Sequence, residues 1–192
     1  MVTNRRTASK DGSDYYVSEE WAVKALLLHE KFSGQIWEPA CGDGKISKIL
    51  ISNGYKVKSS DLNSFGYGAS KVDFLNSSYR ASNIVTNPPY SILNQFMCQG
   101  IKLSRRKLCL LIALARLSSR ARYNLIYRKD PPSRVLVFCE RTTMYPAGYI
   151  SAGSGTTEYA WYVWDKEAPD YGKEGSTRVL WIPPGTKARF GG

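Results

Sequence analysis

The chain has 192 residues, of which 43% are hydrophobic and 22% are charged, a balance typical of a globular domain with enough apolar side chains for a core. No stretch approaches the roughly 20 consecutive apolar residues of a membrane-spanning helix, and the polar first residues do not resemble a secretory signal. We therefore expect a cytoplasmic protein with no membrane partner.

The charge of the chain is strongly basic and unevenly distributed. The net charge is +11, from 27 lysines and arginines against 16 acidic residues, and residues 91–134 hold ten basic residues but one acid. An unopposed excess of one sign favours a polyanionic partner, most naturally nucleic acid, although a basic surface that only aids solubility is an alternative. The side chains expected to bind nucleic acid are Arg105, Arg106, Arg116, Arg120, Arg122, Arg128 and Lys129.

Cysteine and histidine usage excludes several classes of site. The cysteines, Cys41, Cys98, Cys109 and Cys139, have no C-x-x-C spacing, so neither a zinc site nor a disulfide framework is indicated. The only histidine, His29, falls in a predicted helix. A Ser-His-Asp triad or a histidine metal site is therefore not expected.

In chain order, apolar runs and helical repeats alternate. Residues 1–13 are polar and basic and are expected to form a flexible tail, and residues 14–192 a single domain. A first helix is expected after Ser18, which would cap it. Further helices are expected near residues 44–53, 91–103 and 119–128. Strands are expected near residues 35–38, 55–60, 69–73, 83–87, 108–114, 134–140, 158–164 and 177–182. This alternation predicts a doubly wound α/β sheet with ligands at the carboxyl ends of its strands.

The first strand leads into a glycine-containing turn. Residues 38–44 read Glu-Pro-Ala-Cys-Gly-Asp-Gly and precede a predicted helix, which is the first unit of a nucleotide-binding crossover. Ser47 stands where a G-x-G-x-x-G motif has its last glycine, so a pyrophosphate cradle is disfavoured. Asp61 ends the next strand at the spacing expected for a carboxylate that binds ribose hydroxyls, and Asp73 ends another segment.

The tetrapeptide Asn87-Pro88-Pro89-Tyr90 follows a buried strand and must end it, because two prolines cannot continue a sheet ladder. The Asn87 side-chain oxygen and the Pro88 carbonyl can accept both hydrogens of a planar amino group, while Tyr90 stacks on its ring. Two such acceptors favour the pyramidal, nucleophilic form of the nitrogen in the transition state. The alternative is a Pro-Pro turn that only ends the strand.

Together these motifs resemble the S-adenosylmethionine-dependent adenine amino-methyltransferases, whose catalytic motif reads [DNS]-P-P-[YFW], and in particular the small phage-type enzymes. The resemblance covers residues 14–164. It implies a mostly parallel, Rossmann-like sheet of seven strands with an antiparallel C-terminal hairpin, a bacterial or phage-infected host cell, and S-adenosyl-L-methionine as cofactor. The chain has no separate block of the length that sequence-specific DNA methylases use as a target recognition domain.

The resemblance also implies roles for individual residues. Glu38 would face the methionine amino group, Asp61 the ribose hydroxyls and Asp73 the adenine amine. Tyr16 matches the family's N-terminal Tyr-x-Thr-Pro motif, although Ser18 and Glu19 replace Thr-Pro. The residues implied to bind the cofactor are Tyr16, Glu38, Ala40, Cys41, Gly42, Asp61, Leu62, Asp73, Phe74 and Asn87, and the catalytic residues are Asn87, Pro88, Pro89 and Tyr90.

Three functions agree with these features. The first is methylation of the N6 amine of adenine in DNA. The second is the same chemistry on RNA bases or a protein glutamine, because each of these acceptors presents a planar amino group. The third is a non-catalytic protein that binds nucleic acid or sequesters the cofactor. The charge excess favours nucleic acid, with DNA first, and the oligomeric state is left open.

Overall fold

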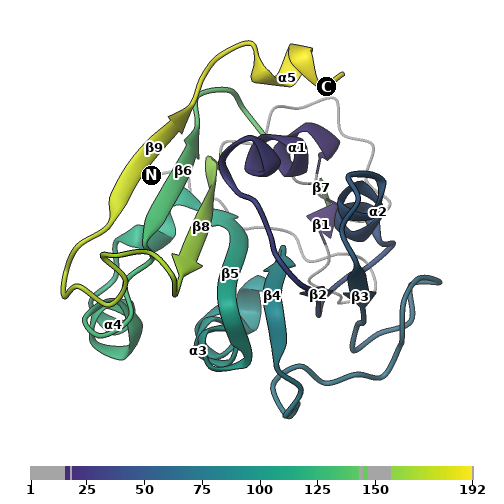
Figure 1. Cartoon of the computed structure of the whole chain (residues 1–192), viewed down its shortest axis with the longest axis horizontal. Helices are drawn as coiled ribbons and strands as arrows, with labels where there is room; N and C mark the ends of the chain where they lie inside the picture. Colours follow the sequence, from purple (N-terminus) through teal and green to yellow (C-terminus); the bar gives the residue numbers. More distant parts are fainter. Residues whose placement is uncertain (1–15, 18, 143–144, 147–156, 192) are drawn as a thin grey trace, which may run out of the picture.

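The computed structural model describes residues 16–17, 19–142, 145–146 and 157–191. Its centre is a seven-stranded sheet with the strand order β3-β2-β4-β5-β8-β6-β9 (Figure 1). Strand β8 runs antiparallel to its neighbours β5 and β6, while the other paired strands are parallel. The strands are β2 (Ile36–Glu38), β3 (Val57–Ser59), β4 (Ala81–Thr86), β5 (Ser104–Ala113), β6 (Arg134–Phe138), β8 (Tyr159–Asp165) and β9 (Arg178–Ile182).

Helices cover both faces of the sheet (Figure 1). Helices α1 (Glu20–His29) and α2 (Lys45–Ser52) pack on one face, and α3 (Leu93–Leu103) packs on the other. A short α4 (Arg120–Arg122) runs into a π-helical turn, η3 (Tyr123–Tyr127), that also packs on the α3 face. The arrangement is a doubly wound, mostly parallel α/β fold of the Rossmann-like type, as the sequence predicted.

The central strands supply both halves of the core because their side chains alternate between the faces. Leu108, Leu110 and Ile112 of β5 lie in the cluster under α3, while Cys109, Leu111 and Ala113 lie in the cluster under α1 and α2. In β8, residues 159–165 are all buried, so this aromatic run packs in the core. Apolar runs without polar alternation therefore mark the strands buried on both sides.

Shorter elements complete the described chain. Strands β1 (Tyr16–Val17) and β7 (Tyr145–Pro146) form a separate antiparallel pair. Single turns η1 (Tyr90–Ile92) and η2 (Leu114–Leu117) follow β4 and β5, and α5 (Thr186–Arg189) lies near the C-terminus. No helix in the described part of the chain has the length and apolar character that crossing a membrane requires.

One predicted strand is wrong. Residues 69–73 form only an isolated bridge between Ser60 and Ala69. Lys71 adopts a φ of 59°, in the left-handed region, and such a residue cannot lie within an extended strand. Strand β9 on the far side of β6 supplies the seventh strand. The N-terminal tail and the predicted cap Ser18 lie outside the described residues, and α1 begins at Glu20 after Glu19.

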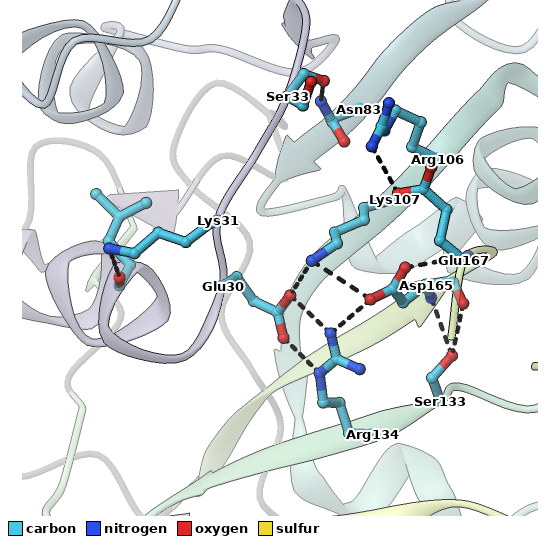
Figure 2. Close-up of polar contacts among 11 residues, drawn as sticks. Glu30, Lys31, Ser33, Asn83, Arg106, Lys107, Ser133, Arg134, Asp165 and Glu167 are labelled. Atoms are coloured by element: carbon cyan, nitrogen blue, oxygen red, sulfur yellow. Dashed lines mark hydrogen bonds and ion pairs between the residues drawn. The ribbon is translucent and has the colours of Figure 1, made fainter. Parts of the chain in front are cut away.

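An ionic cluster of Glu30, Lys107, Arg134 and Asp165 joins the end of α1 to the amino ends of β5 and β6 (Figure 2). Lys107 Nζ donates to Glu30 Oε2 at 2.7 Å. The Arg134 guanidinium donates to the Glu30 carboxylate and also to Asp165 Oδ2, the latter at 2.7 Å. Burial alone would raise the pKa of Asp165, but the Arg134 hydrogen bond and the Lys107 charge hold it below its usual value. The paired charges allow Glu30 to be fully buried.

Candidate active site

A cavity of about 260 Å³ lies at the carboxyl ends of β2, β3 and β4. The loops after these strands line it, because the carboxyl ends of neighbouring parallel strands share one edge of the sheet. The cavity brings together most of the residues that the sequence predicted: Glu38, Ala40, Cys41, Asp61, Leu62, Asp73, Phe74, Asn87, Pro88 and Pro89. The Tyr16 side chain lies outside the described part of the structure.

The loops after β2 and β3 are held together by Asp61, which is 7% exposed. The Gly42 N–H donates to Asp61 Oδ2 at 2.9 Å, and the Asn63 N–H donates to Asp61 Oδ1 at 2.9 Å. Each carboxylate oxygen keeps a second lone pair that can accept a further hydrogen bond. Asp61 therefore fixes the shape of the loops and still presents acceptor capacity to the cavity.

The turn before α2 has no room for side chains. Gly44 has a φ of 81°, and a Cβ at this position would lie 2.1 Å from the Tyr67 ring. The Lys48 ammonium lies 4.9 Å from the centre of the same ring, a cation–π geometry. Tyr67 thus packs the segment after β3 onto the glycine turn.

Glu38 is the buried acid of the site, with 1% of its surface exposed. Its Oε2 accepts a short hydrogen bond from the Ser47 hydroxyl, on the first turns of α2. Burial, together with the charges of Asp43 and Asp61, raises the pKa of Glu38 to about 8 against the lowering effect of its hydrogen bonds with Ser47. A buried carboxyl in such surroundings suits a cationic ligand group, because a positive charge would restore its ionised form.

Cys41 lies in the same loop and has a structural role. Its thiol is 2.9 Å from the position that a Cβ on Gly68 would take, so the two loops touch here. Burial, together with the Glu38 charge, raises the pKa of Cys41 to about 12. The thiol is therefore unreactive, which agrees with the expectation that this position needs a small residue.

Aromatic rings form the wall opposite the acids. Phe74 is 3% exposed, and the centre of its ring lies 4.2 Å from that of Phe96. The Trp37 ring meets the Phe74 ring edge-on, with the ring centres 5.2 Å apart. Asp73 precedes Phe74 and accepts from the Leu75 N–H at 2.8 Å, so its carboxylate is fixed by its own turn. An apolar wall beside an oriented carboxylate can hold a planar heterocycle that carries an amino group.

The tetrapeptide after β4 contributes Asn87, Pro88 and Pro89 to the cavity lining. Tyr90 lies beside the cavity in η1, and its hydroxyl donates to Asn87 Oδ1 at 3.4 Å. The centre of the Tyr90 ring lies 6.5 Å from the centre of the Tyr159 ring in β8. Asn87 and Tyr90 are thus linked, and Asn87 lines the same cavity as the strand-end acids.

The basic residues do not form one surface, contrary to the expectation from their clustering in the sequence. Arg116, Arg120 and Arg122 follow β5 at the cavity edge, and neither Arg116 nor Arg120 forms a salt bridge within the described residues. Arg105 and Arg106 begin β5 at the opposite edge, where Arg106 pairs with Glu167 at 2.8 Å.

Other basic residues of this segment lie toward the amino edge as well. Arg128 and Lys129 lie between η3 and β6, and Arg128 pairs with Glu174 at 3.6 Å. Lys107 and Arg134 are neutralised in the ionic cluster. Strand β5 carries the chain from one edge of the sheet to the other. Basic residues that are close in the sequence are therefore divided between the two edges.

Several residues of the site were missed from the sequence. Phe96 and Ile92 line the cavity from α3 and η1, and Asn63 and Phe65 line it from the loop after β3. Ser47 was noticed only as a missing glycine. Its hydroxyl at helical spacing after the turn was the available signal, but its contact with Glu38 depends on how α2 packs. No cluster of three or more metal-ligating side chains occurs among the described residues.

The sequence matches no family model and no curated protein. A solved class I S-adenosylmethionine-dependent methyltransferase from Listeria monocytogenes has a TM-score of 0.60 and 12% identity over 88% of this chain and 67% of that one. A modification subunit of a type I restriction enzyme from Vibrio vulnificus has a TM-score of 0.58 and 11% identity over 93% of this chain and 49% of its own. An RNA methyltransferase from Pyrococcus horikoshii has a TM-score of 0.51 and 11% identity over 75% of this chain and 81% of its own.

These similarities establish the fold as that of S-adenosylmethionine-dependent methyltransferases. This chain spans about half the length, 49%, of the restriction-modification subunit.

Proposed function

We propose that this protein is an S-adenosylmethionine-dependent methyltransferase that methylates the N6 amine of adenine in DNA. One observation carries the proposal: a single cavity joins the strand-end acids Glu38, Asp61 and Asp73 to Asn87 and Pro88. A cofactor and an acceptor amine would therefore meet in the same space. The fold shared with methyltransferases supports this chemistry.

The donors and acceptors of the cavity fit S-adenosylmethionine. Glu38 would hold the ammonium group, Asp61 would accept from the ribose hydroxyls with its remaining lone pairs, and Asp73 would accept from the adenine amine. Phe74 and Phe96 would contact the adenine ring. The bound cofactor would supply an electrophilic methyl group.

The catalytic contribution of the chain would come from the tetrapeptide after β4. Asn87 Oδ1 and the Pro88 carbonyl would accept the two hydrogens of the substrate amine and so direct its lone pair away from the ring. The Tyr90 hydroxyl donates to Asn87 Oδ1, which fixes the orientation of the amide and leaves the second lone pair of Oδ1 for a substrate hydrogen. The nitrogen would lose a proton as it is methylated, and the product amine would leave with one hydrogen.

Substrate binding would involve the basic residues at the cavity edge. Arg116, Arg120 and Arg122 follow β5, next to the cavity-lining tetrapeptide after β4. Contacts to phosphates on either side of a target nucleotide would hold the strand while the base leaves the stack. Arg105, Arg106, Arg128 and Lys129 lie toward the other edge and are not part of this proposed surface.

The test is to incubate the protein with isotopically labelled S-adenosylmethionine and separate pools of duplex DNA, single-stranded DNA, RNA and protein, and to identify the modified group by mass spectrometry. We expect N6-methyladenine in DNA, formed about a hundred-fold more slowly by the Asn87→Ala variant. Label found in RNA or in protein glutamine would identify a different methyl acceptor for the same transfer chemistry. Cofactor binding without transfer to any pool would favour the non-catalytic alternative.

A further inference from the structure

The cofactor-binding acid Glu38 is connected to the protein surface by two serine hydroxyls. Ser47 is fully buried and bonds the Glu38 carboxyl, and Ser47 Oγ lies 2.5 Å from Ser59 Oγ at the end of β3. Ser59 is partly exposed. The chain of contacts therefore runs from a carboxyl with 1% exposure to a serine that is partly exposed to solvent.

Hydroxyl groups can both donate and accept, so this chain can bond either form of the acid. With Glu38 ionised, Ser59 donates to Ser47 and Ser47 donates to Glu38. With Glu38 protonated, Glu38 donates to Ser47 and Ser47 donates to Ser59. In both cases every member keeps its hydrogen bonds, so a change of protonation leaves no buried group unsatisfied.

The other charged groups around Glu38 oppose its ionisation. Asp43 in the turn and Asp61 after β3 both raise its pKa, and burial raises it most, to about 8. Cys41 is neutral because its own pKa is raised to about 12. Lys45 lines the cavity from the start of α2 but is exposed to solvent. Without a ligand, Glu38 is therefore mainly protonated at neutral pH.

We propose that Ser47 is a positioning residue that, with Ser59, holds Glu38 in either protonation state and thereby couples binding of the cofactor's ammonium group to release of one proton. This inference rests on the proposed function. When the ammonium binds, Glu38 passes its proton to Ser47 Oγ, the Ser47 proton passes to Ser59 Oγ, and the Ser59 proton passes to water. Both hydroxyls keep one hydrogen each, with their directions reversed.

The experiment is calorimetric titration with S-adenosylhomocysteine between pH 6 and 7.5, in buffers of different ionisation enthalpy. The ligand's amino group stays mostly protonated in this range. Only ionised Glu38 pairs with the ammonium, so wild-type affinity should rise about ten-fold for each pH unit, with release of about one proton. Glu38→Gln should bind weakly, with no rise.

Ser47→Ala removes a hydrogen bond that favours the ionised form, so the pKa of Glu38 should increase further. The pH range over which the affinity rises should shift to higher pH by about one unit, so binding at pH 7 should be roughly ten-fold weaker than in the wild type. Ser59→Ala should shift the profile less and in the same direction. The matched control is Ser52→Ala on the same helix, whose hydroxyl donates to the Ile49 carbonyl and accepts from Asn53 Nδ2, and its profile should overlay the wild type.

The outcomes separate the two ideas. Wild-type binding that does not change with pH, or a Ser47→Ala profile that overlays the wild type, would overturn the proton coupling and leave the cofactor site intact. No wild-type binding at any pH would refute the proposed function itself, and this inference with it. Thermal unfolding of each variant identifies a loss of binding that comes only from unfolding, in which case Ser59→Ala provides the test.

Discussion

Replacing Asp61 by alanine should weaken cofactor binding and also destabilise the fold. Asp61 accepts hydrogen bonds at 2.9 Å from the N–H groups of Gly42 and Asn63. Gly42 is buried, so its unpaired N–H would cost about 1–3 kcal/mol, whereas water can satisfy the exposed Asn63. We therefore expect a loss of about 1–3 kcal/mol in the free energy of unfolding.

The same substitution removes the acceptor for the ribose hydroxyls. Hydrogen bonds to a charged group contribute about 1.5–3 kcal/mol each, so affinity should fall by tens-fold or more. Asp73→Ala is the matched comparison, because Asp73 is exposed and bonds its own turn at Leu75 and Asn76. It should weaken binding with little loss of stability.

Two measurements check this prediction: urea denaturation for stability, and titration with S-adenosylhomocysteine at protein concentrations where both variants are folded. Wild-type affinity in Asp61→Ala would refute its role in the cofactor site. Wild-type stability in the same variant would refute the conclusion that Asp61 fixes the two loops. The two roles are therefore tested separately.

Three further sets of substitutions test the catalytic loop, the ionic cluster and the nucleic-acid surface. Asn87→Ala should lower turnover by about a hundred-fold and leave cofactor affinity nearly unchanged; equal turnover in a methyl-transfer assay would exclude its catalytic role. Arg134→Met leaves Lys107 as the only cation for the two buried carboxylates of the cluster and should destabilise the protein by about 3–5 kcal/mol in urea denaturation. Arg128→Met, which breaks an exposed pair, should cost about 0–1 kcal/mol, and similar losses in the two variants would contradict the importance of burial. If Arg116, Arg120 and one further cation bind phosphates, log affinity against log salt should have a slope of about −3, and Arg116→Ala with Arg120→Ala should reduce it to about −1; an unchanged slope would place the nucleic acid elsewhere.

The sequence alone determined the order of the elements and most of the candidate site. Residues 108–114 predicted a central strand because buried strands are continuously apolar, and β5 occupies that position. The glycine turn, Asp61 and Asn87 each follow a predicted strand, and parallel strands place such ends on one edge. These inferences succeeded because they depend on local pattern and on a general property of α/β sheets.

Only the tertiary structure decided the remaining features. The segment 69–73 is not a strand, because the φ of Lys71 lies in the left-handed region. Strand β9, at the edge opposite β3, completes the seven strands of the sheet. The basic segment is divided between two edges because β5 carries the chain across the whole sheet. The contact of Ser47 with Glu38 joins a helix to a strand end. Each of these depends on distances between separate elements, and the pattern of residues within one element does not contain that information.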